Sequence, residues 1–199
     1  RSVKAIHTED RVMAITESGM LLVYQLSDFD LIGEYNLSAQ GTGAMSPGLW
    51  DDTIPSYVSV IEDDSTWIAH GCDIFWRAAN TSFNNWAFYD LCNSNPSQAP
   101  FSSIYATSDA VYLGTDGDGL IILERSEDES TVEIVWSNTT YHSTEPGITT
   151  TIRSDSISSI EMMDEQILVG GEGGVDRHHL PSNSWLSPWT TSNWLNSNE

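Results

Sequence analysis

The chain has 199 residues, of which 39% are hydrophobic, and its 29 acidic against 7 basic side chains give a formal net charge of −22. This apolar and aromatic content is typical of a folded chain rather than a disordered one. Nucleic acids and anionic membranes bind basic surfaces, so the charge argues against both as partners. The acidity favours solubility in a salty medium, with a cationic partner or bound Ca²⁺ as the alternative.

No stretch approaches the roughly 20 consecutive apolar residues that span a bilayer. The chain begins at Arg1 with neither an initiator Met nor a signal-peptide pattern, from which we expect a mature product or a fragment excised from a longer protein. No amphipathic helix, heptad repeat or low-complexity tail is visible, which leaves strands as the expected elements.

Short apolar runs separated by polar turns predict strands in four segments of similar order. In the first segment the predicted strands are Val3–Ile6, Val12–Thr16, Met20–Leu26 and Leu31–Leu37. In the second they are Tyr57–Ile61, Thr66–His70, Asp73–Ala78 and Asn85–Leu91. In the third they are Ser103–Ala106, Ala110–Thr115, Leu120–Arg125 and Val132–Ser137. In the fourth they are Ile157–Met162, Gln166–Gly170, Val175–Leu180 and Trp185–Thr190.

The third strand of a segment carries the clearest signal. Met20–Tyr24 and Leu120–Leu123 are apolar at consecutive positions, so we expect both faces of these strands to be covered. In a two-sheet sandwich one face of each sheet is exposed to solvent, whereas a small sheet stacked between two others has both of its faces buried.

The segments also repeat at similar distances. Aligning Val12, Thr66, Val111 and Ile167 gives spacings of 54, 45 and 56 residues, and four strands per roughly 40–50 residues are typical of β-propeller blades. The sequence therefore predicts an all-β fold, a β-propeller in one domain over residues 1–199. Its four four-stranded blades are expected at about residues 2–37, 56–92, 102–138 and 157–192. A closed four-bladed ring, half of a dimeric ring and part of a larger propeller all remain open.

The turns between second and third strands share a Gly-containing motif. It is clearest at Tyr112–Leu120, and Trp67–Ala69 and Leu168–Val175 match it in part, while the first segment has Ile15 where Gly is usual. Gly after the second strand lets neighbouring sheets approach closely, and Gly in the turn supplies positive φ. These units resemble the two-component regulator propeller repeat. The resemblance implies large rings, often of seven or more blades, in extracytoplasmic sensor regions and some polysaccharide-active proteins, with no shared catalytic residues.

The two cysteines indicate the cellular compartment in which the protein is found. Cys72 and Cys92 lie at equal distances from Ser82, within a polar run that predicts a hairpin turn. Paired residues of a hairpin lie about 5 Å apart between α-carbons, which suits a disulfide, with two buried thiols as the alternative. A disulfide implies an oxidising compartment, and so we expect an extracellular or cell-surface location. N-glycosylation sequons, which agree with secretion, begin at Asn36, Asn80 and Asn138.

Acidic residues recur at matching positions of the four turns, at Glu17, Asp73, Asp116 and Glu172. They predict a ring of negative charge at one end of the molecule, which would attract a cation or a basic peptide; ordinary turn chemistry is the alternative. Asp116 and Asp118 also form a weak Ca²⁺ candidate, although a predicted strand interrupts the spacing of an EF-hand. No other cofactor is expected.

Long connections join the segments, and in a propeller they emerge beside the turns between strands two and three, where ligands are normally met. Exposed aromatic rings stack on sugars or anchor protein partners, while filling gaps between blades is the alternative. The ligand-face candidates in or beside these connections are Trp50, Phe101, Tyr141 and His142. Together with Arg153, Tyr141 and His142 would suit proton abstraction from a uronic acid, as a lyase requires.

The sequence thus favours a non-catalytic extracellular module that binds a protein partner or a glycan through its loop face. Part of a polysaccharide-active, lyase-like enzyme is the first alternative, and a structural component of a surface layer or filament is the second. A homodimer and a larger parent chain both remain open. His178 and His179 are consecutive in a predicted strand, so they point to opposite faces and are not expected to bind one metal together.

Overall fold

The computed structural model describes residues 3–7, 10–16, 18–37, 54, 56–60, 65–71, 73–78, 86–91, 99–125, 136–142 and 152–190. The chain divides into two compact units, Arg1–Phe101 and Ser102–Glu199, and each is described by itself. Every regular element within the described ranges is a β-strand. In that part of the chain no helix has the length and apolar composition of a membrane span.

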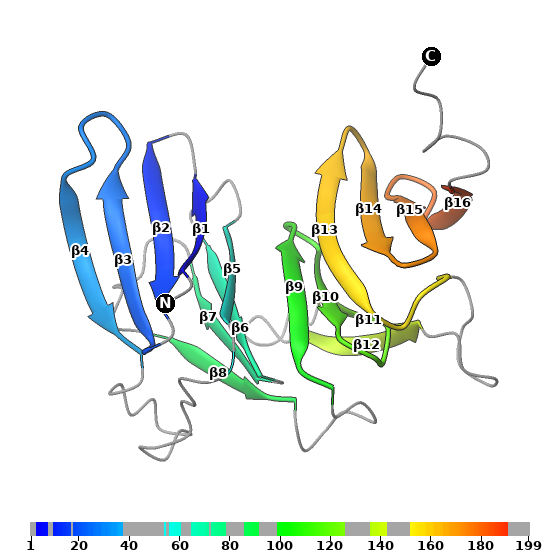
Figure 1. Cartoon of the computed structure of the whole chain (residues 1–199), viewed down its shortest axis with the longest axis horizontal. Coiled ribbons are helices and arrows are strands. Elements are labelled where there is room, and N and C mark those ends of the chain that lie inside the picture. The colour runs from blue at the N-terminus through cyan, green and yellow to red at the C-terminus, as the bar shows by residue number, and fades with distance from the viewer. Residues whose placement is uncertain are drawn as a thin grey trace, which may run out of the picture. The chain divides into compact units, whose positions relative to one another are not determined.

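The first unit contains two antiparallel sheets of four strands each (Figure 1). The first sheet runs in the order β1 (Val3–His7), β2 (Arg11–Thr16), β3 (Met20–Gln25) and β4 (Leu31–Asn36). The second runs in the order β5 (Ser56–Val60), β6 (Thr66–His70), β7 (Asp73–Arg77) and β8 (Ala87–Asp90). Each strand pairs with its neighbour in the chain, so both sheets are meanders.

The second unit repeats this arrangement. Its first sheet runs in the order β9 (Phe101–Ala106), β10 (Ala110–Thr115), β11 (Leu120–Arg125) and β12 (Trp136–His142). The last sheet runs in the order β13 (Ile157–Met163), β14 (Gln166–Gly171), β15 (Gly174–His179) and β16 (Ser184–Trp189). Apart from β12, each strand begins and ends within two residues of its predicted bounds.

The strand β12 corrects the sequence prediction. Its described residues begin at Trp136 and extend through Tyr141 and His142, which the sequence placed in a connection, while residues 132–135 lie outside the described residues. Tyr141 lies opposite Ile121 and His142 opposite Leu120 in the register with β11. Pairing with an apolar partner strand outweighs the polar composition of this stretch, and its β-branched threonines suit a strand.

The two sheets of the first unit share one hydrophobic core. A sulfur–hydroxyl contact of 3.9 Å between Met13 Sδ and Thr66 Oγ1 joins β2 to β6. Alternate residues of β2 and β3 supply one side of this core, as the two-residue period of a strand requires. The buried members of the cluster are Met13, Ile15, Leu21, Val23, Leu37, Ile68, Phe75 and Trp86.

The two sheets of the second unit are packed in the same way. Gly114, near the end of β10, lies directly against β13, because a Cβ there would lie 2.6 Å from Cγ2 of Ile157. This confirms the expectation that a small residue after the second strand lets sheets approach. The core is built from Ala110, Tyr112, Leu120, Ile122, Ile152, Ile157, Ile160, Ile167 and Val169.

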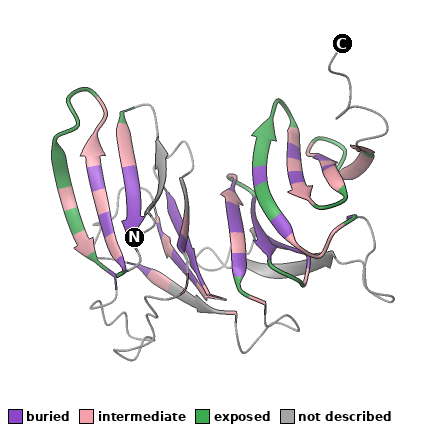
Figure 2. Ribbon diagram, in the orientation of Figure 1, coloured by how far each residue is buried: buried purple, intermediate pink, exposed green. Residues whose placement is uncertain are grey.

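Burial differs between the two sheets of each unit (Figure 2). Every residue of β6 and β10 is buried, and so is the 120–123 stretch of β11, which confirms the prediction for that third strand. In β3 the prediction is wrong, because Leu21 and Val23 are buried while Leu22 is only half-buried. In β14, Leu168 is half-buried between two buried neighbours. Burial therefore alternates between the two faces of the sheet along these two strands.

The cysteine hairpin differs from the prediction in its register. Asp73 lies opposite Asp90 in the pairing of β7 with β8, whereas a turn centred on Ser82 would place it opposite Leu91. The register is thus shifted by one residue in the described part of the hairpin. Cys72 and Cys92 lie outside the described residues, and their disulfide stays a prediction.

Candidate functional site: the loop surface of the second unit

The turn between β10 and β11 is tied to the segment that precedes β13. The backbone N–H groups of Gly117 and Gly119 both donate to the carbonyl of Asp155, at 3.0 and 2.7 Å. The hydroxyl of Ser156 donates to Oδ1 of Asp116 at 2.8 Å, and the same two residues form an isolated antiparallel bridge. The turn between strands two and three therefore meets the connection, as the sequence predicted for the ligand face.

A buried carboxylate holds the other end of this segment. Oδ2 of Asp176, on β15, accepts the backbone N–H of Arg153 at 2.8 Å, and its Oδ1 lies 3.8 Å from Nε of the same arginine. Burial raises the pKa of Asp176, and the bond and charge of Arg153 counteract part of that shift. Asp176 thus acts as an anchor for the connection, since its side chain is only 8% exposed while that of Arg153 is 48% exposed.

The turn between β14 and β15 completes this surface. A Cβ added to Gly173 would lie 2.8 Å from Cβ of Arg153, so the turn packs directly against the segment. We call the resulting patch the loop surface, defined as the Asp116–Gly119 turn, the Ile152–Ser156 segment and the Glu172–Gly173 turn. Its exposed charged residues are Asp116, Arg153 and Glu172.

The structure places three of the four predicted acidic turn residues. Asp116 and Glu172 are exposed on the loop surface, whereas Asp73 is half-buried at the start of β7, opposite His70. Glu17 lies outside the described residues. The surroundings of these carboxylates differ, and the ring of negative charge stays a prediction.

The Ca²⁺ candidate gains no further ligands from the described residues. The backbone N–H of Asp118 donates to Oγ1 of Thr115 at 3.0 Å, a turn bond within the motif. Nowhere in the described ranges do three or more His, Cys, Asp or Glu side chains gather as a metal would require. Calcium binding by Asp116 and Asp118 stays a prediction.

The aromatic ligand-face candidates do not form a site among the described residues. Phe101 is 1% exposed, and its backbone N–H donates to the carbonyl of Gly71 at 2.6 Å. Its ring therefore fills the interior, and the prediction that it faces a ligand is wrong. Trp50 lies outside the described residues, as do the side chains of Tyr141 and His142.

The lyase hypothesis stays a prediction, because the side chains of Tyr141 and His142 lie outside the described residues. Arg153, the residue expected to neutralise a uronate, already lies against the buried carboxylate of Asp176. The sequence did not identify Asp176 as a functional residue. Its only signal is a carboxylate in the third strand of its segment, at a position where the other three segments have apolar residues.

A second polar group joins the two sheets of this unit around His178, which is 6% exposed. Its Nε2 lies 2.9 Å from Oδ1 of Asn183, an atom that only accepts, so Nε2 carries the proton. The other nitrogen, Nδ1, then accepts from the hydroxyl of Tyr112 at 3.4 Å. The ring also lies 5.0 Å from that of Trp185.

Burial keeps both members of this pair uncharged. It raises the pKa of Tyr112 to about 12 and lowers the pKa of His178, with the bond to Asn183 opposing the latter shift. The pair therefore works as a neutral hydrogen bond between β10 and β15. The prediction that His178 and His179 point to opposite faces is confirmed by their different neighbours.

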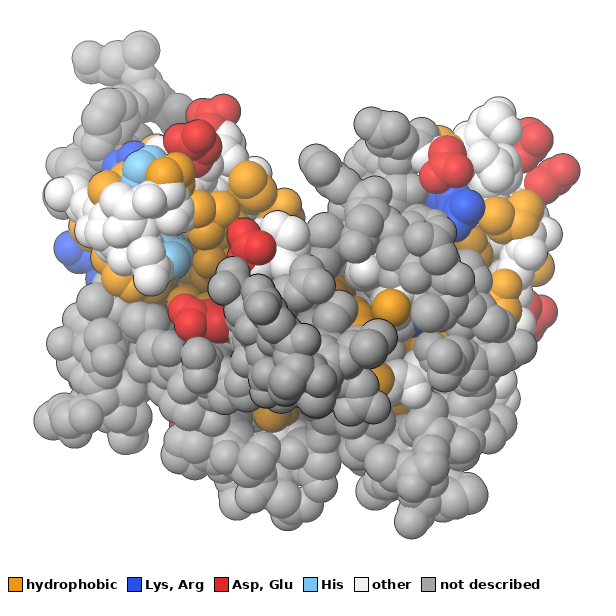
Figure 3. Space-filling view, turned by 180° about the vertical axis from the view of Figure 1, so that it is seen from behind, with side chains coloured by type: hydrophobic (Ala, Val, Ile, Leu, Met, Phe, Trp, Pro, Cys, Tyr) orange, Lys and Arg blue, Asp and Glu red, His pale blue; other side chains and the backbone are white. Residues whose placement is uncertain are grey.

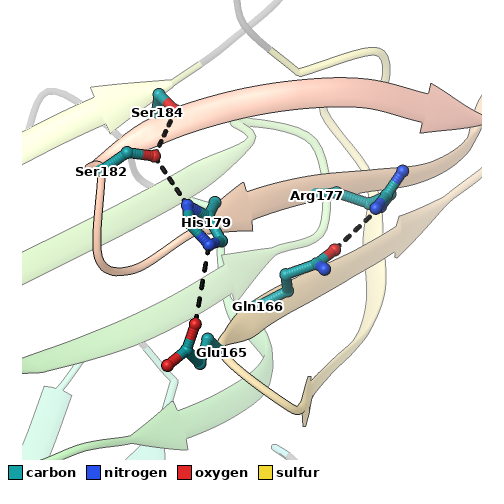
Figure 4. A network of polar contacts seen from close by, with 6 residues as sticks. All are labelled: Glu165, Gln166, Arg177, His179, Ser182 and Ser184. Atoms are coloured by element: carbon teal, nitrogen blue, oxygen red, sulfur yellow. Dashed lines mark hydrogen bonds and ion pairs between the residues drawn. The ribbon is translucent and has the colours of Figure 1, made fainter.

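His179 belongs to an exposed polar network on the other face of the last sheet (Figure 4). Its Nδ1 lies 2.7 Å from Oγ of Ser182, which lies 2.7 Å from Oγ of Ser184. Glu165 Oε2 is 3.8 Å from Nε2 of His179, and its side chain is 74% exposed. A catalytic triad needs a buried, hydrogen-bonded carboxylate to orient the histidine, so we interpret this group as a surface network.

Figure 3 shows the described side chains from behind: apolar groups reach the surface of the second unit beside histidine and uncharged polar groups, and acidic groups are spread across the surface. No concentration of basic groups is visible there, in agreement with the net charge of −22.

Comparison with known proteins gives the fold. No family model and no curated protein matches the chain. Among solved structures, U3-55K and the RRP9 WD40 repeats each match with a TM-score of 0.58 at 11% identity, over 93% of this chain and 51% and 50% of theirs. The Cps50 (Swd1) β-propeller domain of Myceliophteria thermophila matches with a TM-score of 0.62 at 9% identity, over 95% of this chain and 55% of its own.

The chain thus spans about half the length of these structures. At such low identity the likeness concerns the fold alone, and the two-component regulator type of repeat stays a prediction. The chain has an all-β fold, and its four four-stranded sheets are blades of a β-propeller.

Proposed function

We propose that these blades belong to a non-catalytic module that binds a protein partner through the loop surface. The observation that carries the proposal is the set of cross-connections that fix this surface, from Asp155 and Ser156 to the β10–β11 turn and from Asp176 to Arg153. A surface that is already ordered loses little conformational entropy on binding, which favours affinity.

The charges define the chemistry of the partner. Asp116 and Glu172 are exposed on the loop surface, Arg153 is the single cation among its defined residues, and the chain carries a net charge of −22. A partner with a basic patch would be steered towards this surface by the field of the whole molecule. We therefore favour a basic protein segment over an uncharged glycan.

An extracellular or cell-surface location is part of the same proposal. It rests on the predicted Cys72–Cys92 disulfide and on the sequons, because disulfides persist in oxidising compartments. Intact-mass measurement of the natively purified protein after alkylation without reductant would detect the bridge; two alkylated thiols would count against it.

A selection from a displayed library of random peptides tests the binding surface. We expect peptides rich in Lys and Arg to be enriched on the immobilised protein and to lose at least tenfold in affinity on the variant Asp116→Asn/Glu172→Gln. Asn at residue 116 keeps an oxygen that accepts from Ser156, so the turn should stay intact. The matched control is Asp28→Asn/Asp109→Asn, which removes two exposed charges at other turns.

Equal loss of affinity in the control variant would show only a general effect of charge and contradict the loop surface as the site. Failure to enrich any basic peptide would contradict the proposed partner chemistry.

A further inference from the structure

Exposed apolar side chains gather at one hairpin of the first unit. Among the described residues, five large hydrophobic side chains are exposed, and three of them lie between residues 29 and 32. Phe29 is 67% exposed, Leu31 49% and Ile32 51%. They occupy the turn between β3 and β4 and the start of β4, which Figure 2 colours as exposed. Single exposed apolar residues are ordinary, but a contiguous group indicates an interaction site.

The backbone of Phe29 has a conformation that its side chain disfavours. Its φ is 58°, in the left-handed region that Gly and Asn adopt readily and that a bulky residue rarely does. The turn between β15 and β16 offers a comparison within the same chain, since Asn183 has a φ of 46° there. Backbone strain of this kind concentrates at functional sites.

The two turns are equivalent in their sheets. Each joins the third strand to the fourth and begins with a leucine whose backbone N–H donates to a carbonyl in the turn between the first and second strands. Leu26 donates to Asp10 at 2.8 Å, and Leu180 donates to Glu165 at 2.9 Å. In each turn the residue with positive φ follows three positions after that leucine. The asparagine in the last sheet therefore shows that this turn does not require a phenyl ring.

Hydrogen bonds hold the turn that carries Phe29. Its backbone N–H donates to the carbonyl of Gln25 at 2.9 Å, and the N–H of Gln25 donates to the carbonyl of Asp30 at 2.9 Å. The N–H of Asp30 donates to Oδ1 of Asp28 at 3.2 Å, and the side-chain amide of Gln25 donates to the carbonyl of Asp10 at 2.9 Å. A ring presented from an ordered turn loses little conformational entropy on binding.

The strand that follows the turn is irregular where its exposed apolar residues lie. Tyr24 lies opposite Leu31 whereas Val23 lies opposite Gly33, so Ile32 is an extra residue in β4. A β-bulge of this kind redirects side chains. Beyond it, exposed and half-buried residues alternate along β4, but Leu31 and Ile32 are both exposed.

Acidic groups surround these apolar side chains. The charged residues whose side chains the structure describes in this sheet are Asp10, Arg11, Asp28, Asp30 and Glu34. All four acidic residues are exposed, and two of them directly precede and follow Phe29. The base among these five, Arg11, has its Nε 3.6 Å from the carboxylate of Asp10. Lys and Arg side chains of a partner would complement this rim, whereas an anionic membrane would be repelled.

We propose that Phe29, Leu31 and Ile32 form a second binding surface, the hairpin surface, which takes an extended protein segment with apolar side chains flanked by Lys or Arg. Apolar side chains of the segment pack on these three, with Phe29 as the aromatic anchor. Its basic side chains pair with Asp28 and Asp30. Phe29 lies in the turn, beyond the ends of β3 and β4, so its exposure does not depend on what packs against the faces of the sheet.

Peptide selection on the variant Asp116→Asn/Glu172→Gln separates this surface from the loop surface, because the variant lacks the loop-surface carboxylates. We expect a displayed library of random peptides to yield sequences that combine aromatic or aliphatic residues with Lys and Arg. Their affinity should fall by about tenfold or more when Phe29→Asn is added. The matched control is Met163→Asn, which changes a side chain that is 40% exposed at another hairpin and should leave the affinity unchanged.

Thermal unfolding of Phe29→Asn distinguishes a binding role from a structural one. The substitution installs the residue type that the last sheet has in the equivalent turn, so the thermal midpoint should rise or stay constant while the selected peptides are lost. A midpoint that falls would show that Phe29 is retained for packing, and would overturn the proposal.

Two further outcomes would overturn the hairpin surface. One is a selection that yields no such peptides, or only peptides that bind Phe29→Asn as tightly as the parent protein. The other is binding of the parent protein to phosphatidylcholine vesicles that is lost in Phe29→Asn, which would assign the exposed side chains to a membrane. The loop surface is tested separately with peptides selected on the parent protein, so the failure of one proposal leaves the other intact.

Discussion

At the scale of single residues, two buried polar groups organise the second unit. Asp176 fixes the backbone of Arg153, and His178 joins β15 to Tyr112 on β10. Both are satisfied by hydrogen bonds, as buried polar groups must be to avoid a large desolvation cost. Their role is to position a connection and a neighbouring sheet.

His178 should make stability depend on pH. Its folded pKa lies below the ordinary 6.5, so the unfolded chain binds a proton first as the pH falls. Its contribution is therefore fully present above pH 6.5 and is lost as the pH falls towards the folded pKa. We expect the difference in free energy of unfolding between the parent protein and His178→Gln to shrink over that interval, measured by urea denaturation.

The matched control for this experiment is His179→Gln, which changes a half-exposed histidine on the opposite face. An unchanged difference between the parent and His178→Gln across the interval would contradict the buried neutral imidazole. Carboxylates titrate in all three proteins and cancel in the comparison.

At the scale of elements, the approach of β9 and β10 to β13 decides how the two sheets of the second unit pack. Gly114 leaves no room for a side chain against Ile157, and Ser103 lies buried in the same contact with no hydrogen-bond partner for its hydroxyl. Because glycine has no side chain, the backbone at this position can approach the neighbouring sheet more closely than at any other residue type.

Gly114→Ala should therefore destabilise the protein by about 1–3 kcal/mol, the usual cost of overpacking. Ser103→Ala should be neutral or slightly stabilising, because it removes a buried hydroxyl without a partner. Urea denaturation of both variants and of the double variant gives the test. We expect the double variant to recover part of the loss; a Gly114→Ala protein as stable as the parent would contradict the close approach.

At the scale of the whole molecule, the net charge of −22 opposes compactness through repulsion among carboxylates. Dissolved salt screens exposed charges, with a Debye length that falls from about 30 Å at 0.01 M to about 8 Å at 0.15 M. The thermal midpoint should accordingly rise as NaCl is added from low concentration.

A non-ionic solute at the same osmolality serves as the control for this measurement, since it does not screen charge. A midpoint that stays constant or falls with NaCl would mean that ion pairs contribute more than repulsion does. Ion pairs in the described residues include Arg11 with Asp10 at 3.6 Å and Arg153 with Asp176 at 3.8 Å.

Sequence reasoning predicted the strands because their signals are local. Apolar runs of fixed period and Gly-containing turns depend on neighbouring residues only, so fifteen of the sixteen strands were placed within two residues. The exception, β12, depends on pairing with β11, and that pairing is a long-range interaction which its polar composition does not reveal. The sequence placed Tyr141 and His142 in a connection rather than in a strand for the same reason.

The sequence by itself determined the repeat and the all-β fold of four blades. It also determined that the long connections lie beside the turns between second and third strands. Only the tertiary structure decided what each polar residue contacts: Asp116 with Ser156, Arg153 with Asp176, and Phe101 in the interior rather than on a ligand face. Tertiary packing likewise decided that burial alternates along β3 and β14. The sequence shows which residues of a strand are apolar. Whether those residues are buried depends on the sheet that packs against the strand.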